Sequence, residues 1–250
     1  MKQKLVYYFS PTGGTQKIAE AIGKYAECPP VDIIVDAYDA EADADALIYF
    51  CVPVYGGRVP KPMYERMQHI TGKKTAAVVV AVYGNNEVGD ALVEMSDLCE
   101  KSNFRVIAGM EMIAQHSLTP KVATGRPDAG DFSKLESFVK EVEAKYAKED
   151  FSAPKLPGNH KYRRYVGLPI KPAGSLSCVG CGMCFDNCPV GAIPEKHLRR
   201  TNALKCISCM HCVHVCTTDS RYIPKADQLV VYAYLKKKGA IARKEPKLYI

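Results

Sequence analysis

The chain of 250 residues contains no tryptophan and no apolar run that approaches the roughly 20 residues needed for a membrane-spanning helix. The missing run excludes a membrane anchor of that kind, and we expect no membrane span. The segment from Met1 to Leu5 leads directly into a strand-like pattern and lacks the layered arrangement of a signal peptide. We therefore expect a cytoplasmic protein in a reducing compartment, where cysteines stay free.

Acidic residues are scarce in the second part of the chain. Residues 1–150 carry 17 Lys and Arg against 22 Asp and Glu, a net charge of −5. Residues 151–250 carry 17 Lys and Arg against only 5 Asp and Glu, a net charge of +12. A surface of this sign suits nucleic acid, an acidic protein partner or the acidic first half of the same chain.

Cysteine, by contrast, is abundant, and eight of the 11 cysteines form two runs of the same spacing. The runs read Cys178-x2-Cys181-x2-Cys184-x3-Cys188-Pro189 and Cys206-x2-Cys209-x2-Cys212-x3-Cys216. This is the spacing with which bacterial ferredoxins hold two [4Fe-4S] clusters, and the chain resembles them here. Three soft thiolates from one short loop can converge on a cubane, and the fourth comes from elsewhere in the chain.

The resemblance implies a crossed set of ligands, because in two-cluster ferredoxins the last cysteine of each run binds the other cluster. One cluster would be held by Cys178, Cys181, Cys184 and Cys216, and the other by Cys206, Cys209, Cys212 and Cys188. Two structural zinc sites are the main alternative, although zinc sites usually pair two short hooks across a longer loop. A disulfide scaffold is a further alternative, but nothing indicates secretion.

The clusters also explain part of the positive charge. Each oxidised cluster with four thiolates carries about −2, which offsets part of the basic excess. We therefore expect no nucleic-acid partner. The remaining charge favours a redox protein as electron donor or acceptor, and its positive sign suits an acidic one.

The first 150 residues alternate between apolar strand-like runs and amphipathic helical patterns. Continuous apolar strands separated by helices predict an α/β fold with a doubly wound parallel sheet covered on both faces. The predicted strands span residues 4–10, 31–35, 46–52, 75–83 and 105–113, and the predicted helices span 15–25, 62–70, 87–101 and 132–148.

The turn after the first predicted strand has the composition of a phosphate-binding loop. It reads Ser10-Pro11-Thr12-Gly13-Gly14-Thr15, and it is neither a Walker loop nor a dinucleotide-binding G-x-G-x-x-G. Hydroxyls, two glycines and helix N-terminal amides suit a phosphate dianion without a Lys or Arg. The turn resembles the phosphate loop of flavodoxins, Ser/Thr-x-Thr-Gly-x-Thr, and an ordinary helix cap is the alternative interpretation.

Two further turns follow strands at the same predicted edge, where ligands bind in open α/β sheets. In flavodoxin-like proteins such loops hold the isoalloxazine ring of FMN, and the resemblance implies a sheet order of 2-1-3-4-5. Because the chain has no tryptophan, Tyr55 or Tyr83 would stack on the ring. The predicted FMN contacts from these turns are Pro53, Val54, Tyr55, Gly56, Gly57, Tyr83, Gly84, Asn85 and Asn86.

As a whole the chain resembles a flavodoxin-like domain fused to a C-terminal two-[4Fe-4S] ferredoxin domain. We expect an FMN domain over 1–150, a basic Pro/Gly linker over 151–174, a small α+β ferredoxin-like domain over 175–225, and a C-terminal helix and tail over 226–250. The implied function is intramolecular electron transfer between the clusters and FMN, in a low-potential carrier of anaerobic metabolism.

Two other functions fit the same residues. One is an FMN-dependent reductase of a small organic or corrinoid substrate that is fed by the clusters. The other is a non-redox module that binds zinc and nucleic acid. We predict no catalytic acid, base or nucleophile, because the cofactors of a relay supply the chemistry.

Overall fold

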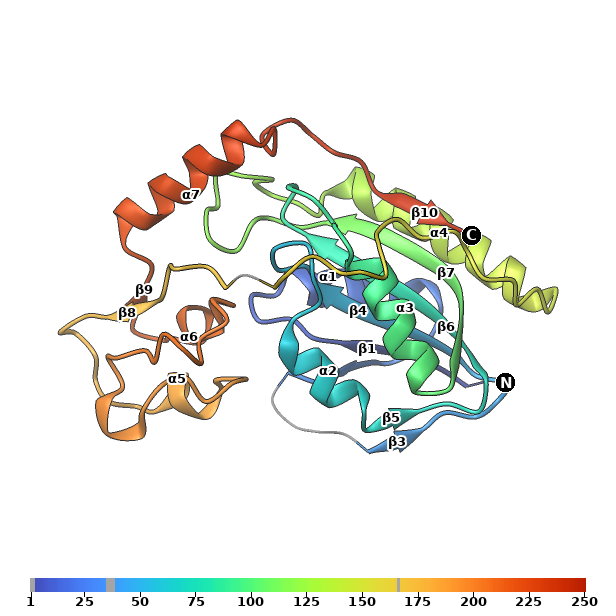
Figure 1. Cartoon of the computed structure of the whole chain (residues 1–250), viewed down its shortest axis with the longest axis horizontal. Helices are drawn as coiled ribbons and strands as arrows, with labels where there is room; N and C mark the ends of the chain where they lie inside the picture. The colour runs from blue at the N-terminus through green and yellow to red at the C-terminus, as the bar shows by residue number, and fades with distance from the viewer. Residues whose placement is uncertain (1–2, 35–38, 166) are drawn as a thin grey trace.

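The computed structural model describes residues 3–34, 39–165 and 167–250. A six-stranded sheet has the order β10-β7-β6-β4-β1-β2, in which five strands are parallel and β10 is antiparallel (Figure 1). The parallel part has the flavodoxin-like order 2-1-3-4-5, which confirms the predicted fold. The strands are β1 (Lys4–Tyr8), β2 (Pro30–Asp32), β4 (Leu47–Pro53), β6 (Thr75–Tyr83), β7 (Phe104–Ile113) and β10 (Lys247–Tyr249).

Helices cover both faces of the sheet because successive strand residues point to opposite faces and both sets are apolar. One core lies under α1 (Gly14–Tyr25) and α4 (Ala129–Ala147). The other lies under α2 (Lys61–Met67) and α3 (Ala91–Lys101). Every residue of β6 is buried, as a central parallel strand requires. A small parallel pair, β3 (Ala40–Glu41) and β5 (Ile70–Thr71), lies outside the main sheet.

Some predicted boundaries change for identifiable reasons. The helix predicted from residue 87 begins at Ala91, because residues 87–90 form a loop whose last residue, Asp90, occupies the N-cap position. The strand predicted over 31–35 is β2, which ends at Asp32, and residue 35 lies outside the described residues. No helix in the described part of the chain is long and apolar enough to cross a membrane.

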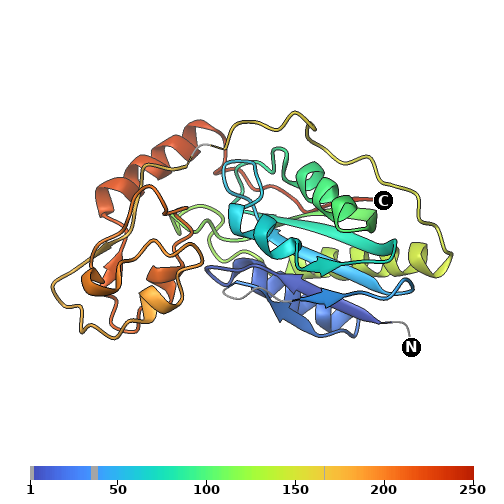
Figure 2. The same ribbon diagram turned by 60° about the horizontal axis from the view of Figure 1, so that its bottom comes forward.

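The cysteine-rich region forms a small lobe beside the carboxyl edge of the sheet (Figures 1 and 2). We call residues 173–223 the lobe. Its regular elements are short: β8 (Ala173–Gly174), α5 (Met183–Asp186), the 3-10 turn η1 (Glu195–His197), α6 (His211–His214) and β9 (Arg221–Tyr222). β8 and β9 form an antiparallel pair that joins the two ends of the lobe.

The connection into the lobe packs along the sheet domain for much of its length. Asp90 accepts hydrogen bonds from the backbone N–H of Asn159 (3.1 Å) and of Arg163 (2.8 Å). Tyr162 donates to Asp97, and the Arg163 guanidinium pairs with Glu87 at 2.6 Å. The basic linker is thus fixed to an acidic strip on and before α3.

The end of the chain corrects the prediction of a tail. After α7 (Lys225–Lys237) the chain returns to the sheet, where β10 pairs with β7. Asn85 donates to the carbonyls of Ala240 (2.6 Å) and Ala242 (2.7 Å) and accepts from the backbone N–H of Lys244 (3.2 Å). We call residues 239–249 the C-terminal strap. The lobe is therefore tethered to the sheet domain at both of its ends.

Candidate functional site

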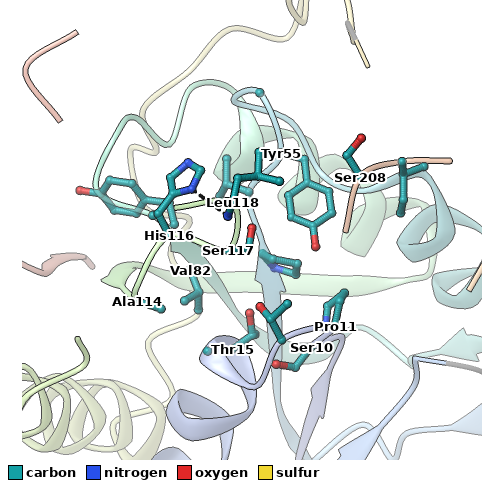
Figure 3. Close-up of a pocket in the computed structure, with 18 of the residues that line it drawn as sticks. Ser10, Pro11, Thr15, Tyr55, Val82, Ala114, His116, Ser117, Leu118 and Ser208 are labelled. Carbon is teal, nitrogen blue, oxygen red and sulfur yellow. Dashed lines mark hydrogen bonds between the residues drawn. The ribbon is translucent and has the colours of Figure 1, made fainter. Parts of the chain in front are cut away.

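A pocket opens at the carboxyl edge of the sheet, where the loops after four parallel strands meet (Figure 3). Parallel strands bring their carboxyl ends to one edge, so loops distant in sequence become neighbours. Three of the loops are the predicted ones. From them the pocket is lined by Ser10, Pro11, Thr12, Gly14, Thr15, Pro53, Val54, Tyr55, Gly56, Tyr83 and Gly84.

The first loop presents the start of α1 to the pocket. Gly13 is the N-cap residue in a left-handed conformation (φ 78°) and provides no side-chain cap. The Ser10 hydroxyl accepts from the backbone N–H of Gln16 at 2.9 Å, and its own O–H can still donate. The amides of Gly14 and Thr15 belong to the first turn and have no partner within the helix. This set of hydroxyls and amides has the chemistry of a phosphate site.

The second loop makes a tight turn around two glycines. Tyr55 and Arg58 bond to each other through their backbones at 3.0 and 3.2 Å, and Gly56 and Gly57 both have positive φ. Glu94, a fully buried carboxylate of α3, fixes this turn through an ion pair with Arg58 at 2.6 Å. Figure 3 shows the Tyr55 ring at the pocket, and burial raises the pKa of Tyr55 well above 10.0.

The third loop contributes less than we predicted. Tyr83 is buried in the core on the α3 face, where burial and the nearby Glu111 raise its pKa to about 12. Asn85 and Asn86 hold the C-terminal strap, Asn86 by accepting a bond from the Lys244 ammonium. Gly57 accepts a hydrogen bond from the backbone N–H of Asp90 at 2.8 Å, and a side chain added at Gly57 would meet Arg163. Four predicted contacts are therefore not among the residues that line the pocket: Gly13, Gly57, Asn85 and Asn86.

A fourth loop, which follows β7, was missing from our prediction. Residues 114–118 line the pocket, and the Nδ1 of His116 accepts from the backbone N–H of Leu118 at 3.2 Å. Burial lowers the pKa of His116 to about 4, so its imidazole is neutral near pH 7. Ligands bind at the carboxyl ends of parallel strands, so this loop was a possible binding loop from its position alone. Its sequence, however, has no glycine-rich or phosphate-loop motif that would have identified it.

The rest of the pocket wall comes from outside the sheet domain. Tyr165 and Leu168 belong to the connection into the lobe, and Ile207 and Ser208 lie between two cysteines of the second run. His211, in α6, donates from Nδ1 to the Pro11 carbonyl at 2.7 Å. The second cysteine run therefore packs directly on the predicted phosphate loop. His211 thus joins α6 to that loop.

The eight cysteines fall into two groups that mix the runs. Cys178, Cys181, Cys184 and Cys216, the first cysteine set, surround one small hollow. Cys188 lies with the other run: burial and the neighbouring thiols of Cys212, Cys188 and Cys206 together raise the pKa of Cys209 to about 12. We call Cys188, Cys206, Cys209 and Cys212 the second cysteine set. The grouping matches the crossed arrangement that the ferredoxin resemblance implies.

Backbone donors already point at several sulfurs. The Sγ of Cys188 accepts from the N–H of Ala192 at 3.2 Å, and that of Cys206 from Ser208 at 3.4 Å. The Sγ of Cys216 accepts from Arg221 at 3.4 Å. Hydrogen bonds of this kind stabilise anionic sulfur.

A buried arginine connects the two cysteine sets. Arg221 is only 2% exposed, its guanidinium lies 3.7 Å from the Cys212 sulfur, and its backbone N–H bonds to Cys216. The other hydrogen bonds of its guanidinium go to backbone carbonyls and to the Thr201 hydroxyl. Among the described residues, Arg221 forms no ion pair with a carboxylate. A buried cation without a counter-charge is costly. Two anionic clusters would supply that charge, so the residues fit iron–sulfur clusters.

The spacing of the thiols also bears on zinc. Across the described ranges, no three His, Cys, Asp or Glu side chains gather closely enough to hold one metal ion. Thiolates around a cubane bind different iron atoms and stand farther apart than those around a single ion.

Comparisons with known proteins agree with the cysteine pattern. Residues 177–220 match the 4Fe-4S dicluster domain family. A search of curated proteins gave no match. The match of residues 177–220 to the dicluster family supports an iron–sulfur electron-transfer domain in the lobe.

Solved structures similar to this chain include two flavodoxins and a reductase. A flavodoxin of Streptococcus pneumonia TIGR4 is 17% identical with a TM-score of 0.41, over 58% of this chain and 99% of its own. Oxidised Flavodoxin 2 from Bacillus cereus is 16% identical with a TM-score of 0.41, over 59% and 99%. A flavone reductase is 10% identical with a TM-score of 0.44, over 62% and 66%. Because these TM-scores are below 0.5, we base the fold on strand order alone.

Proposed function

We propose that this chain is an electron relay in which FMN in the carboxyl-edge pocket exchanges electrons with two [4Fe-4S] clusters in the lobe. One observation carries the proposal: Ile207 and Ser208, between ligands of the second cysteine set, form part of the pocket wall. The hydrogen bond from His211 to Pro11 supports the same proximity. A cluster held by the second cysteine set would thus be the neighbour of the flavin, and the first set would be remote from it.

The residues of the pocket have separate roles in this proposal. The hydroxyls of Ser10, Thr12 and Thr15 and the first amides of α1 bind the FMN phosphate. The Tyr55 ring stacks on the isoalloxazine, because Tyr83 is committed to the core. The loops 53–56 and 114–118 would hold the ring in the pocket and exclude water from it. FMN can accept one or two electrons, whereas each cluster accepts one. A protein with both cofactors can therefore exchange electrons with one-electron and with two-electron carriers.

The lobe supplies ligands and charge. The first and second cysteine sets each hold one cluster, and Arg221 lies between them as a shared positive charge. The partner is a redox protein that donates or accepts single electrons, and the basic second half of the chain favours an acidic one. The three other cysteines, Cys28, Cys51 and Cys99, are buried and unbridged, which suits a reducing cytoplasm.

Anaerobic purification followed by cofactor analysis tests the relay. We expect iron and acid-labile sulfide in equal amounts for two [4Fe-4S] clusters, with one FMN per chain. After rapid mixing with dithionite, bleaching of the cluster and flavin bands should include a phase whose rate does not depend on protein concentration. Colourless protein, or a flavin phase that scales with protein concentration, would overturn the proposal.

A second candidate function rests on a groove between the sheet domain and the lobe. The groove shares Tyr165, Leu168 and Ile207 with the flavin pocket, and its other walls include Lys61 and Lys205. A small anionic acceptor could approach the flavin from there, which favours the reductase alternative. Steady-state reduction of a small anionic quinone or corrinoid that is abolished by Lys205→Glu would support it.

A further inference from the structure

The first cysteine set differs from the second in its exposure to solvent. Each set has one buried member, Cys184 and Cys209, both 7% exposed, but only the first set has an exposed member, Cys181. Cys178 and Gly180 line an open groove whose opposite wall is formed by residues 195–200. The groove lies beside the hollow that the first cysteine set surrounds. Since the second set packs on the sheet domain, an external electron carrier can approach most closely here.

The wall of this groove is strongly basic. Lys196, Arg199 and Arg200 are exposed, and His197 stands among them. In the part of the chain that the structure describes, none of these three side chains has an ion pair with a carboxylate. Glu195 is the one acidic residue that lines the groove within the described chain. By contrast, three arginines in the sheet domain or packed against it, Arg58, Arg126 and Arg163, pair with acids.

Exposed apolar side chains flank Cys178 in the chain. Leu176 is 90% exposed and Val179 is 69% exposed. The backbone N–H of Gly174, two residues before Leu176, donates to the Arg199 carbonyl at 3.0 Å, which keeps this segment beside the basic wall. An apolar centre with a charged rim is the usual composition of a protein-binding surface.

We propose that Lys196, Arg199, Arg200, Leu176 and Val179 form a docking face for a small acidic one-electron redox protein. This inference rests on the proposed relay and assigns the first cysteine set as its port to other proteins. Complementary charge speeds encounter and orients the partner, while a small apolar centre allows rapid release. Transient electron-transfer complexes use small interfaces.

Charge-reversal variants of the anaerobically purified full-length chain test the docking face. The probe is a small acidic bacterial-type two-cluster ferredoxin, and the measurement is its dissociation constant by calorimetry at several salt concentrations. The triple variant Lys196→Glu/Arg199→Glu/Arg200→Glu should weaken binding at least tenfold and flatten its salt dependence. The matched control, Lys236→Glu/Lys237→Glu/Lys238→Glu at the end of α7, reverses three exposed cations elsewhere and should change affinity less than twofold.

Leu176→Ser separates the apolar contribution from the electrostatic one. It should weaken binding several-fold and leave the salt dependence unchanged, because no charge is altered. Equal losses in the groove and control triple variants would overturn the docking face in favour of unspecific attraction. Self-association of the chain in place of ferredoxin binding, or binding of duplex DNA that the triple variant abolishes, would also overturn it.

Cofactor counts on the same samples keep the two proposals distinct. If all variants contain iron, sulfide and FMN but bind the probe alike, the docking face is wrong and the relay stands. If the wild-type protein lacks iron or FMN, the relay itself fails, whatever the binding data show.

Discussion

The sheet domain and the lobe bury their side chains to very different degrees. In the sheet domain, β4 and β6 are almost completely buried and two apolar cores fill the space under the helices. In the lobe the longest helices have four residues, and the buried apolar side chains are few, among them Ala192, Ile193 and Met210. A region of about 50 residues with so small a core does not hold its fold by burial alone. Metal–ligand bonds would supply the missing stability.

The same contrast appears in their buried charges. In the sheet domain the buried Arg126 pairs with the buried carboxylate of Asp131. The lobe buries Arg221 against carbonyls and sulfur. The first arrangement is complete in the protein alone, whereas the second gains its counter-charge only from clusters. The sheet domain should therefore tolerate loss of cofactors that the lobe does not.

The largest expected effect is the loss of a cluster from the lobe while the sheet domain stays folded. Cys188→Ser removes one ligand of the second cysteine set, so the cluster held with Cys206, Cys209 and Cys212 should be lost or degraded. Iron content should fall by about half or be converted to a cluster of fewer irons, as iron analysis and electron paramagnetic resonance can measure. Hydrogen exchange in β4 and β6 should stay slow while exchange in α6 rises.

The control for this change is Cys99→Ala, which removes a buried thiol of the sheet domain. It should leave the iron content unchanged. Selective loss of the cluster on Cys178, Cys181 and Cys184 in Cys188→Ser would contradict the crossed arrangement.

The second prediction reverses the first by removing FMN and sparing the clusters. Thr12→Glu places a carboxylate at the start of α1, where it favours the helix but repels a phosphate dianion. FMN affinity should fall at least 100-fold, about 3 kcal/mol, with iron content unchanged. Thr12→Ser keeps the hydroxyl and should retain the flavin. Stoichiometric FMN in Thr12→Glu would exclude this loop as the phosphate site.

The third prediction sharpens the comparison at the junction of the two regions. Asn85→Ala removes the three bonds to the C-terminal strap and leaves two carbonyls without that donor, so the free energy of unfolding should fall by about 3 kcal/mol. Asn103→Ala is the matched control, because Asn103 also has a positive φ but makes one side-chain bond, to Gly72. It should cost about 1 kcal/mol. Similar losses in urea unfolding would show that the strap bonds contribute little.

The smallest expected effect concerns pH. Because the folded pKa of His116, about 4, lies below its ordinary value of 6.5, the unfolded chain binds the extra proton between these values. Stability should thus be unaffected above pH 7 and fall on acidification, by about 1 to 2 kcal/mol at pH 5. His116→Leu should remove this component. The measurement is the difference between the two pH profiles of urea unfolding, in which acid effects common to both proteins cancel.

Features that depend on short stretches of adjacent residues could be predicted from the sequence. The buried parallel strands appear as apolar runs, their order follows from the flavodoxin resemblance, and the cysteine runs identify the lobe. The loop over 10–15 and Tyr55 also reach the predicted pocket. In each case a few adjacent residues carry the whole signal.

The missed features depend on contacts between distant segments. β10 has only three residues, too few for a recognisable period, and becomes a strand because β7 offers a free edge. Asn85 seemed to suit a flavin loop, but its partners lie more than 150 residues away. Arg221 belongs to no motif, and its role follows from the fold that brings it between the cysteine sets.

The C-terminal strap also sets an order of assembly. Lys247–Tyr249 leaves the ribosome only after all eight cysteines of the lobe have been translated, so one edge of β7 stays open until then. An open edge invites pairing with other chains. A polypeptide interrupted between the last cysteine and residue 247 would expose that edge and become a target for aggregation or proteolysis. Loss of the strap would therefore leave the sheet domain with an open edge on β7.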